Sequence, residues 1–423
     1  MPMKYNRTGF PGNIGFSSVI DEKFKTNSIV IRFITELNAE RSAENTIGIG
    51  VLTDSSSTYK TLAELNEKLS SLYGASLNSG AKKRGDVQIL SVAASWINNR
   101  YAIDGEDITG EMLDIVCGCV FSPNAENGSF DEETFNITKR DLLDKIDAEI
   151  NNKRGYAISR AAETAFKGEA AQNSCYGTRA AAEKVTPASA YSAYCKLLEN
   201  AQVEIMYIAP EENLEVENRL KTEFGKIDRR SSERKFFSPS PLKPDVERIS
   251  DELDVRQSKM VLSFKTDSDD KHALKLLSTI YGETPVSKLF MNVREKLSLC
   301  YYCACRTIGS KNTFMVDCGV EKSNIEKAES EILHQLDEIR NGNISDEELS
   351  SAMLSIENAL AAVGDTPSSY SLWYFERFCE GSIITPEQQL EAFKSVTKER
   401  IIEAAKSLKL DSVYLMLNKE AQE

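Results

Sequence analysis

Hydrophobic positions in the first part of the chain follow two different periods. Apolar and β-branched residues crowd Ser28–Ile34, which predicts a strand, and Gly15–Ile20 predicts the strand that pairs with it in an early hairpin. Leucines then recur at the spacing of one helical face, at positions 62, 65, 69 and 72. They predict a helix over Ser57–Tyr73 that ends at Gly74.

The strand pattern returns at Val87–Trp96 and, after a long helical region, at Ala201–Ile208. The segment that follows, residues 228–246, holds three prolines and clustered charge without periodicity, which is typical of a linker. We therefore expect one domain at 1–227, a linker at 228–246 and a second domain at 247–423.

The second half returns to the same order of elements. Its predicted strands are Lys259–Phe264, Cys300–Arg306, Thr313–Val320 and Asp411–Leu417, and its predicted helices are Asp269–Tyr281, Pro285–Leu297, Asn324–Arg340 and Lys398–Leu408. Ile29–Phe33 parallels Met260–Phe264, and Leu65–Ser70 parallels Val293–Ser298, both at an offset of about 230 residues. The halves therefore resemble diverged copies of one α+β layer with antiparallel strands.

Composition narrows the class of protein. A chain of 423 residues is too long for one ordinary core, and 41% hydrophobic and 27% charged residues are typical of globular domains. A net charge of −14 disfavours nucleic acid or an anionic membrane as the main partner. The start lacks the apolar stretch of a signal peptide, and nine irregularly spaced cysteines indicate reduced thiols. We expect a cytoplasmic protein.

Arg294 and Tyr301 are the strongest candidates for chemistry. Arg294 lies beside the apolar stripe of its predicted helix, and Tyr301 follows just past the helix end. A turn between helix and strand can bring a guanidinium and a phenol to one sheet edge, where they would hold a peptide carbonyl or steady an oxyanion. The plainer interpretation is a surface arginine and a packed tyrosine.

These residues lie in a longer pattern that resembles a family signature. Gly282, Ser287–Phe290, Val293–Lys296 and Leu299–Tyr301 resemble the C-terminal signature of the pitrilysin/insulinase metallopeptidases, with Lys288 in place of Arg and Ser298 in place of Gly. The segments Lys23–Thr26, Leu72–Ala75 and Ile344–Leu349 extend the resemblance over the whole chain. It implies two homologous α+β domains around a chamber, each an antiparallel sheet with helices on one face. It also implies that Arg294 and Tyr301 reach substrate held at a zinc ion.

The zinc motif of that family is missing. Its H-x-x-E-H pattern places two histidines and a glutamate on one helix. The chain has only His272 and His334, which are far apart in the sequence, and each is expected to have a structural or surface role. The segment Thr46–Leu52, where the motif should fall, contains no His, Asp, Glu or Cys. We expect no metal site and no cofactor in this chain.

A cysteine site is the rival interpretation. Cys300, Cys303 and Cys305 include a C-x-x-C spacing, and Cys117 and Cys119 add two more thiols. Strand alternation would place Cys303 and Cys305 on one face and Cys300 on the other, which would divide the group. Core packing is therefore favoured over a metal or redox role.

The resemblance implies a non-catalytic subunit, inactive alone, that works beside a zinc-bearing homologue in a two-chain metalloendopeptidase. This chain would supply Arg294 and Tyr301 for binding a peptide substrate, and the partner would supply zinc. A homodimer is the other assembly considered. The alternative function is a catalytically dead peptide-binding or scaffold protein that adds extended peptides to a sheet edge.

Overall fold

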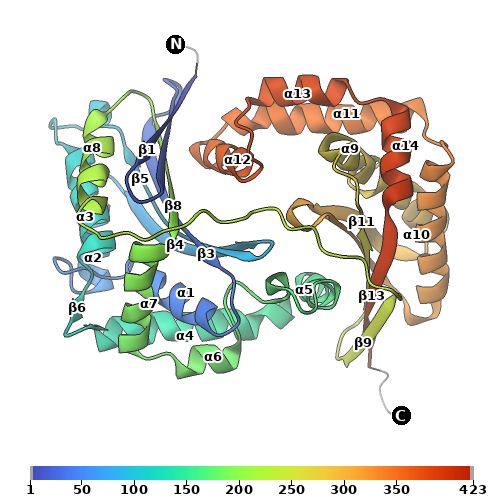
Figure 1. The fold of residues 1–423 in the computed structure, drawn as a ribbon, viewed down its shortest axis with the longest axis horizontal. Helices are drawn as coiled ribbons and strands as arrows, with labels where there is room; N and C mark the ends of the chain where they lie inside the picture. The colour runs from blue at the N-terminus through green and yellow to red at the C-terminus, as the bar shows by residue number, and fades with distance from the viewer. Residues whose placement is uncertain (1–2, 420–423) are drawn as a thin grey trace. The chain divides into compact units, whose positions relative to one another are not determined.

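The computed structural model describes residues 3–419, which form two compact units (Figure 1). Neither unit is continuous in sequence. The first unit contains the chain up to Ala148, Asn173–Lys235 and Gly364–Glu376. The second unit contains Glu149–Gln172, Phe236–Val363 and the chain from Arg377 onward. Each unit therefore includes a short segment from the opposite half of the sequence.

The first unit is built on a six-stranded sheet in the order β1-β2-β8-β3-β5-β4. Its strands are β1 (Lys4–Phe10), β2 (Ile14–Ile20), β3 (Thr26–Glu36), β4 (Ser76–Arg84), β5 (Val87–Ile97) and β8 (Gln202–Ala209). The strands at Val87–Ile97 and Gln202–Ala209 confirm the prediction. All pairs are antiparallel except β2 with β8, which is parallel.

The predicted hairpin between Gly15–Ile20 and Ser28–Ile34 is wrong, because β8 lies between these two strands. The hairpin forms one step earlier, between β1 and β2. Gly12 and Asn13 close its turn with φ angles of 82° and 58°, a conformation that glycine and asparagine adopt at little cost. A strand that arrives from residue 202 leaves no local signal near β2 and β3.

Helices cover this sheet. They are α1 (Arg41–Val51), α2 (Leu62–Ser71), α3 (Ile108–Phe121), α4 (Glu132–Ala148), α6 (Arg179–Lys184), α7 (Pro187–Asn200) and α8 (Leu214–Phe224). The helix predicted from Ser57 begins only at Leu62, where the Thr61 side chain accepts a hydrogen bond from the Glu64 amide. The main core joins these helices to β3 and β5 through residues such as Ile31 and Leu90.

The second face of this sheet is contacted by α12 (Pro367–Cys379), a helix from the end of the chain. Tyr374 stacks on Tyr5 with ring centroids 4.2 Å apart, and the Arg32 guanidinium lies 4.5 Å from the Phe375 ring. Arg32 alternates along β3 with core residues, so this contact is on the side of the sheet opposite to the core.

The second unit repeats the plan with five strands in the order β11-β12-β10-β13-β9. They are β9 (Glu247–Leu253), β10 (Ser258–Lys265), β11 (Cys300–Ile308), β12 (Thr313–Val320) and β13 (Lys409–Asn418). Its helices are α9 (Lys271–Gly282), α10 (Ile325–Arg340), α11 (Asp346–Ala361), α13 (Pro386–Lys394) and α14 (Lys398–Ser407), joined by the π-helix η4 (Leu289–Lys296). The predicted α+β class is confirmed, and every predicted strand of this half is present.

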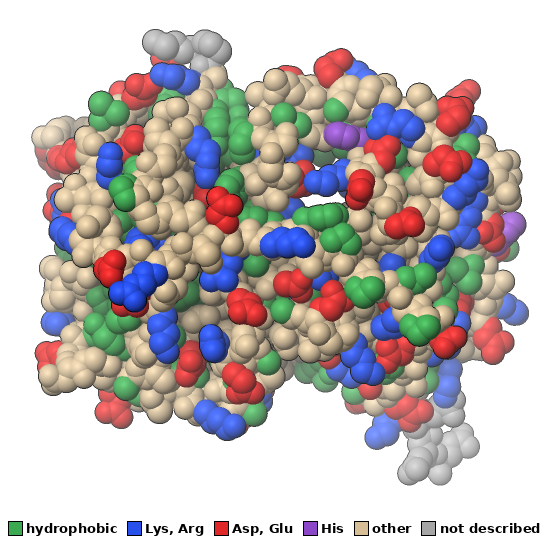
Figure 2. Space-filling view, in the orientation of Figure 1, with side chains coloured by type: hydrophobic (Ala, Val, Ile, Leu, Met, Phe, Trp, Pro, Cys, Tyr) green, Lys and Arg blue, Asp and Glu red, His purple; other side chains and the backbone are tan. Residues whose placement is uncertain are grey.

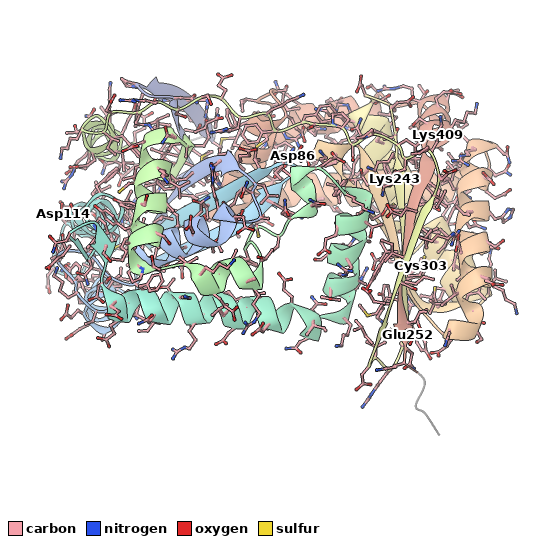
Figure 3. The ribbon with its side chains drawn as sticks, turned by 60° about the horizontal axis from the view of Figure 1, so that its bottom comes forward. Asp86, Asp114, Lys243, Glu252, Cys303 and Lys409 are labelled. Carbon is pink, nitrogen blue, oxygen red and sulfur yellow. The ribbon has the colours of Figure 1, made fainter. Side chains whose placement is uncertain are left out.

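The other face of this sheet carries α5 (Lys153–Ala165), which comes from the first half of the chain (Figures 1 and 3). Small side chains such as Ala157 and Ala161 let it lie close to Val261, Met315 and Tyr414 in one buried cluster. Each sheet therefore has helices on both faces, whereas the predicted arrangement has helices on one face. The additional helix comes from the opposite half of the chain.

Acidic and basic side chains are interspersed over the face in view in Figure 2. Within residues 3–419, no helix is both long and apolar enough to cross a membrane.

The contact between α5 and the second sheet predicts a large effect of side-chain volume. Ala161 is buried, so Ala161→Phe should overfill the cluster and lower the free energy of unfolding by about 1–3 kcal/mol. Ser159 on the same helix is exposed, so Ser159→Phe is the matched control and should change the melting temperature little. Equal melting temperatures for the two variants would contradict this view of α5.

Candidate functional site

Arg294 lies on the π-helix η4, a wider turn than the helix predicted for this segment. The Leu297 amide donates to the Asn292 carbonyl at 3.2 Å, one residue farther back than in an α-helix. Leu289 and Val293 are buried beneath it. Such widened turns are rare and occur often at functional sites, because the extra residue redirects the side chains that follow.

Ser298 ends this helix in the left-handed region, with φ at 51°. The Ser298 amide donates to the Arg294 carbonyl at 3.1 Å, and the Leu299 amide donates to the Val293 carbonyl at 3.0 Å. The family signature has glycine at this position, which adopts such a φ without a steric penalty. The serine keeps the turn at a cost in strain.

The Arg294 side chain is partly open to solvent, at 39% exposure. Its guanidinium lies 4.5 Å from the Phe290 ring and 3.6 Å from the Glu295 carboxylate. An ion pair of that length in partly exposed surroundings is weak. The aromatic ring therefore orients the guanidinium while N–H donors stay available to a ligand.

Tyr301 occupies a β-bulge at the start of β11. Cys300 pairs with Val320 and Tyr302 pairs with Gly319, so Tyr301 is the extra residue. Its side chain is 65% exposed, and within residues 3–419 its hydroxyl makes no hydrogen bond. Bulges redirect side chains in this way beside active sites. Arg294 and Tyr301 thus lie on either side of the Ser298 turn, and they make no hydrogen bond or cation–π contact with each other in the described residues.

The bulge also corrects the prediction for the cysteines. It restarts the alternation of β11, so Cys300 is buried together with Cys303 and Cys305 instead of on the opposite face. Cys303 lies opposite Cys318, its cross-strand neighbour on β12, and its neighbours Cys300 and Cys318 raise the pKa of its thiol (Figure 3 labels Cys303). The alternation argument failed because one extra residue reverses it.

The segment Thr46–Leu52, where the sequence lacks the zinc motif, runs along helix α1 and one residue beyond it. A Cβ atom on Gly50 would lie 2.5 Å from the Thr138 Cγ2 atom of α4, and one on Gly48 would lie 2.9 Å from the Ala190 carbonyl oxygen of α7. Both distances are shorter than real contacts allow. A zinc site therefore does not fit these residues, because the segment lacks ligands and neighbouring helices leave no room for larger side chains at Gly48 or Gly50.

Neutral hydrogen bonds occupy the rest of α1. The buried Gln88 amide of β5 donates to the Ser42 carbonyl at 3.0 Å and the Cys175 carbonyl at 2.7 Å, and it accepts from Asn45 at 2.9 Å. Thr46 donates to the Ser42 carbonyl at 2.7 Å. These groups satisfy one another without any charge, as buried polar groups must.

Neither histidine belongs to a cluster of metal ligands. His272 on α9 meets the Phe393 ring edge-on at 5.0 Å, and burial lowers its pKa. His334 on α10 lines an open pocket with Lys288 and Lys296. Across residues 3–419, no three His, Cys, Asp or Glu side chains are placed to hold a metal ion together.

Comparisons with known proteins agree with this picture. A family model described as "Peptidase M16 inactive domain" matches residues 184–355. A relative from Bacillus subtilis, "Probable inactive metalloprotease YmfF", is 26% identical over 97% of each chain. Over residues 184–355 the chain is similar to the peptidase M16 family. The matched model and the name of this relative both describe homologues of the inactive type.

Solved structures show the same fold. A conserved protein from Enterococcus faecalis has a TM-score of 0.90 and 26% identity, and 100% of both chains is covered. The peptidase M16 inactive domain from Pseudomonas fluorescens has a TM-score of 0.80 at 15% identity, again over 100% of both chains. Together with the matched family model and the Bacillus subtilis relative, this shared fold bears out the resemblance to the pitrilysin/insulinase peptidases.

Sequence reasoning missed the closed packing around α1. Its signal was the pair Gly48 and Gly50, because glycines inside a helix weaken it and often mark a close approach. Gln88 gave no such signal, since a polar residue within an apolar strand is identified as buried only when its partners are known.

The turn after η4 predicts a stabilising substitution. Ser298→Gly should remove about 1–2 kcal/mol of strain from the left-handed conformation, but glycine also raises the conformational entropy of the unfolded chain. The free energy of unfolding should therefore rise by about 0.5–1 kcal/mol. Thermal unfolding measures this. The matched control is Ser159→Gly on the exposed face of α5, where the same change should destabilise.

The close packing around α1 predicts that alanine in place of one of its glycines lowers the stability of the protein. Gly48→Ala should destabilise the protein despite the better helix propensity of alanine, because the nearest obstacle is backbone. Gly118→Ala on α3 has no atom within 4 Å of the new Cβ, so it should stabilise by about 0.5–1 kcal/mol. Stabilisation by both would disprove the close approach.

The three cysteines of β11 should react at different rates. The hydrogen bond from Cys303 and the charge of Arg294 lower the pKa of Cys300, whereas burial raises the pKa of Cys305 to about 12. Iodoacetamide at pH 8 should therefore label Cys300 first, as peptide mass spectrometry would show. Arg294→Met should slow that labelling, and Arg248→Met, a change to an exposed arginine on β9, should not.

Proposed function

We propose that this chain is the non-catalytic subunit of a two-chain M16 peptidase, in which Arg294 and Tyr301 bind the substrate. A zinc-bearing homologue would supply the metal. The observation that carries the proposal is the contrast between the two candidate regions. Arg294 and Tyr301 are partly or largely exposed on a widened helix and a bulge, while the α1 position is closed by packing.

Two features support a role in binding for this pair. The turn at Ser298 is kept although serine is strained there, and the bulge keeps a large aromatic side chain in solvent. Both features cost stability, and local strain of this kind concentrates at functional sites. A guanidinium and a phenol hydroxyl are suited to hold a carbonyl oxygen as negative charge develops on it.

The experiment mixes the purified chain with a zinc-bearing homologue from the same source and measures peptide cleavage. The double variant Arg294→Ala with Tyr301→Phe should lower kcat/KM by at least about tenfold, a loss of roughly 1.4 kcal/mol. The control is Arg100→Ala with Tyr101→Phe, a neighbouring pair on the first unit in which each side chain is 39% exposed. Full activity of the Arg294/Tyr301 variant in the mixture would rule out the proposed role.

The alternative is a peptide-binding protein without catalysis in any mixture. It is supported by β4, an edge strand of the first sheet whose residues are mostly exposed. An edge strand offers main-chain donors and acceptors to an extended peptide. Binding of a peptide by the chain, with no cleavage when the zinc-bearing homologue is added, would favour this function.

A further inference from the structure

A cluster of cationic side chains lies on the face of the second sheet that carries α5. Arg154 comes from α5, Lys259 from β10 and Arg306 from β11. They surround Asp317 of β12 and the ring of Tyr302. All five residues belong to the second unit, and neither Arg294 nor Tyr301 is among them.

The Asp317 carboxylate already accepts three hydrogen bonds from arginine side chains. Arg154 Nε and Nη2 donate to its two carboxylate oxygens at 2.5 Å and 3.3 Å, and Arg306 Nη2 donates at 2.8 Å. The carboxylate side chain is 1% exposed, whereas the arginine side chains are 43% and 41% exposed. The buried anion therefore orients both guanidiniums from below and leaves other N–H groups open.

Tyr302 forms the floor of this cluster. The Arg154 guanidinium lies 4.3 Å from the centre of its ring, and the Lys259 ammonium lies 5.5 Å from it. The ring lies over Gly319, where a Cβ atom would be 2.6 Å from Tyr302 Cε1 and 2.5 Å from Gln257 Oε1. Gln257 also accepts a hydrogen bond from Lys259 at 2.7 Å. Only glycine at this position leaves room for the ring and the amide.

The charges of the cluster do not balance. Three cations face one buried carboxylate, within a chain whose net charge is −14. Burial lowers the pKa of Lys259 and the charge of Arg154 lowers it further, while Asp317, Glu321 and Cys318 act in the opposite direction. Arg160, also on α5, is instead paired with Glu163 and Asp251. An anion placed here would relieve the repulsion between the cations.

We propose that Arg154, Arg306 and Lys259 bind a carboxylate of a peptide, so that the chain prefers acidic peptides. Guanidinium forks match the planar geometry of a carboxylate, and the ring below them shields one side from water. This inference rests on the proposed function, since it names the class of peptide that would be held. The carboxylate could come from a side chain or from a C-terminus, and the chemistry of the site is the same for both.

The test measures fluorescence anisotropy of the full chain with three labelled peptides of equal length. One has glutamates and an amidated end, one is neutral with a free C-terminus, and one is neutral and amidated. We expect at least one carboxylate-bearing peptide to bind about tenfold more tightly than the third. The carboxylate-bearing peptide that binds more tightly identifies whether the carboxylate comes from a side chain or from a C-terminus. Arg306→Ala and Lys259→Met should each remove the preference, whereas Arg248→Ala, on the same sheet but paired with Glu329, should keep it.

The outcomes separate this inference from the proposed function. Equal binding of all three peptides would overturn the carboxylate site and leave peptide binding intact. If no peptide binds, glutarate is titrated while the NMR signal of methylated Lys259 is followed. A shift that Arg306→Ala abolishes would keep the anion site and count against peptide binding. No shift would overturn the site. Arg306→Ala keeps Arg154 on Asp317, so the buried carboxylate stays paired in the variant.

Discussion

Each sheet of this protein has two faces that must be covered, and the second face is covered by a helix from the opposite half of the chain. α5 lies on the sheet of the second unit and α12 lies on the sheet of the first. The exchange positions one member of the cationic cluster, Arg154. Arg154 reaches Asp317 only because α5 lies on that sheet, and the cationic cluster could not form without it.

Packing also closes the segment Thr46–Leu52, where the resemblance would place a metal. If only the ligand residues were missing, the segment would still have room for two histidines that could bind a metal. Here Gly48 and Gly50 let the neighbouring helices close on α1, and a neutral network joins Asn45 to Gln88. Interior contacts therefore fill the position where the resemblance would place a metal. A zinc site here would require several simultaneous changes in α1, α4 and α7.

Much of this could be predicted from sequence. Local patterns located the central strands of both sheets and most helices of the second half, but not β1, β4, β9 or α12. The lack of ligand residues in Thr46–Leu52 was visible directly. What could not be predicted depends on shifts of a single residue or on distant segments. One extra residue makes the π-turn of η4, another makes the bulge at Tyr301, and the bulge reverses the side on which Cys300 lies. The insertion of β8 between β2 and β3 is encoded nowhere near either strand.

The exchange of helices has a consequence for synthesis on the ribosome. Chains emerge from the N-terminus, and domains generally fold as they appear. The first sheet is complete once β8 has emerged, yet the segment Gly364–Glu376 that lies against it arrives only after most of the second unit. One face of that sheet therefore stays uncovered until then, so chaperones can bind the nascent first half. Truncation before α12 would leave this exposed state permanent.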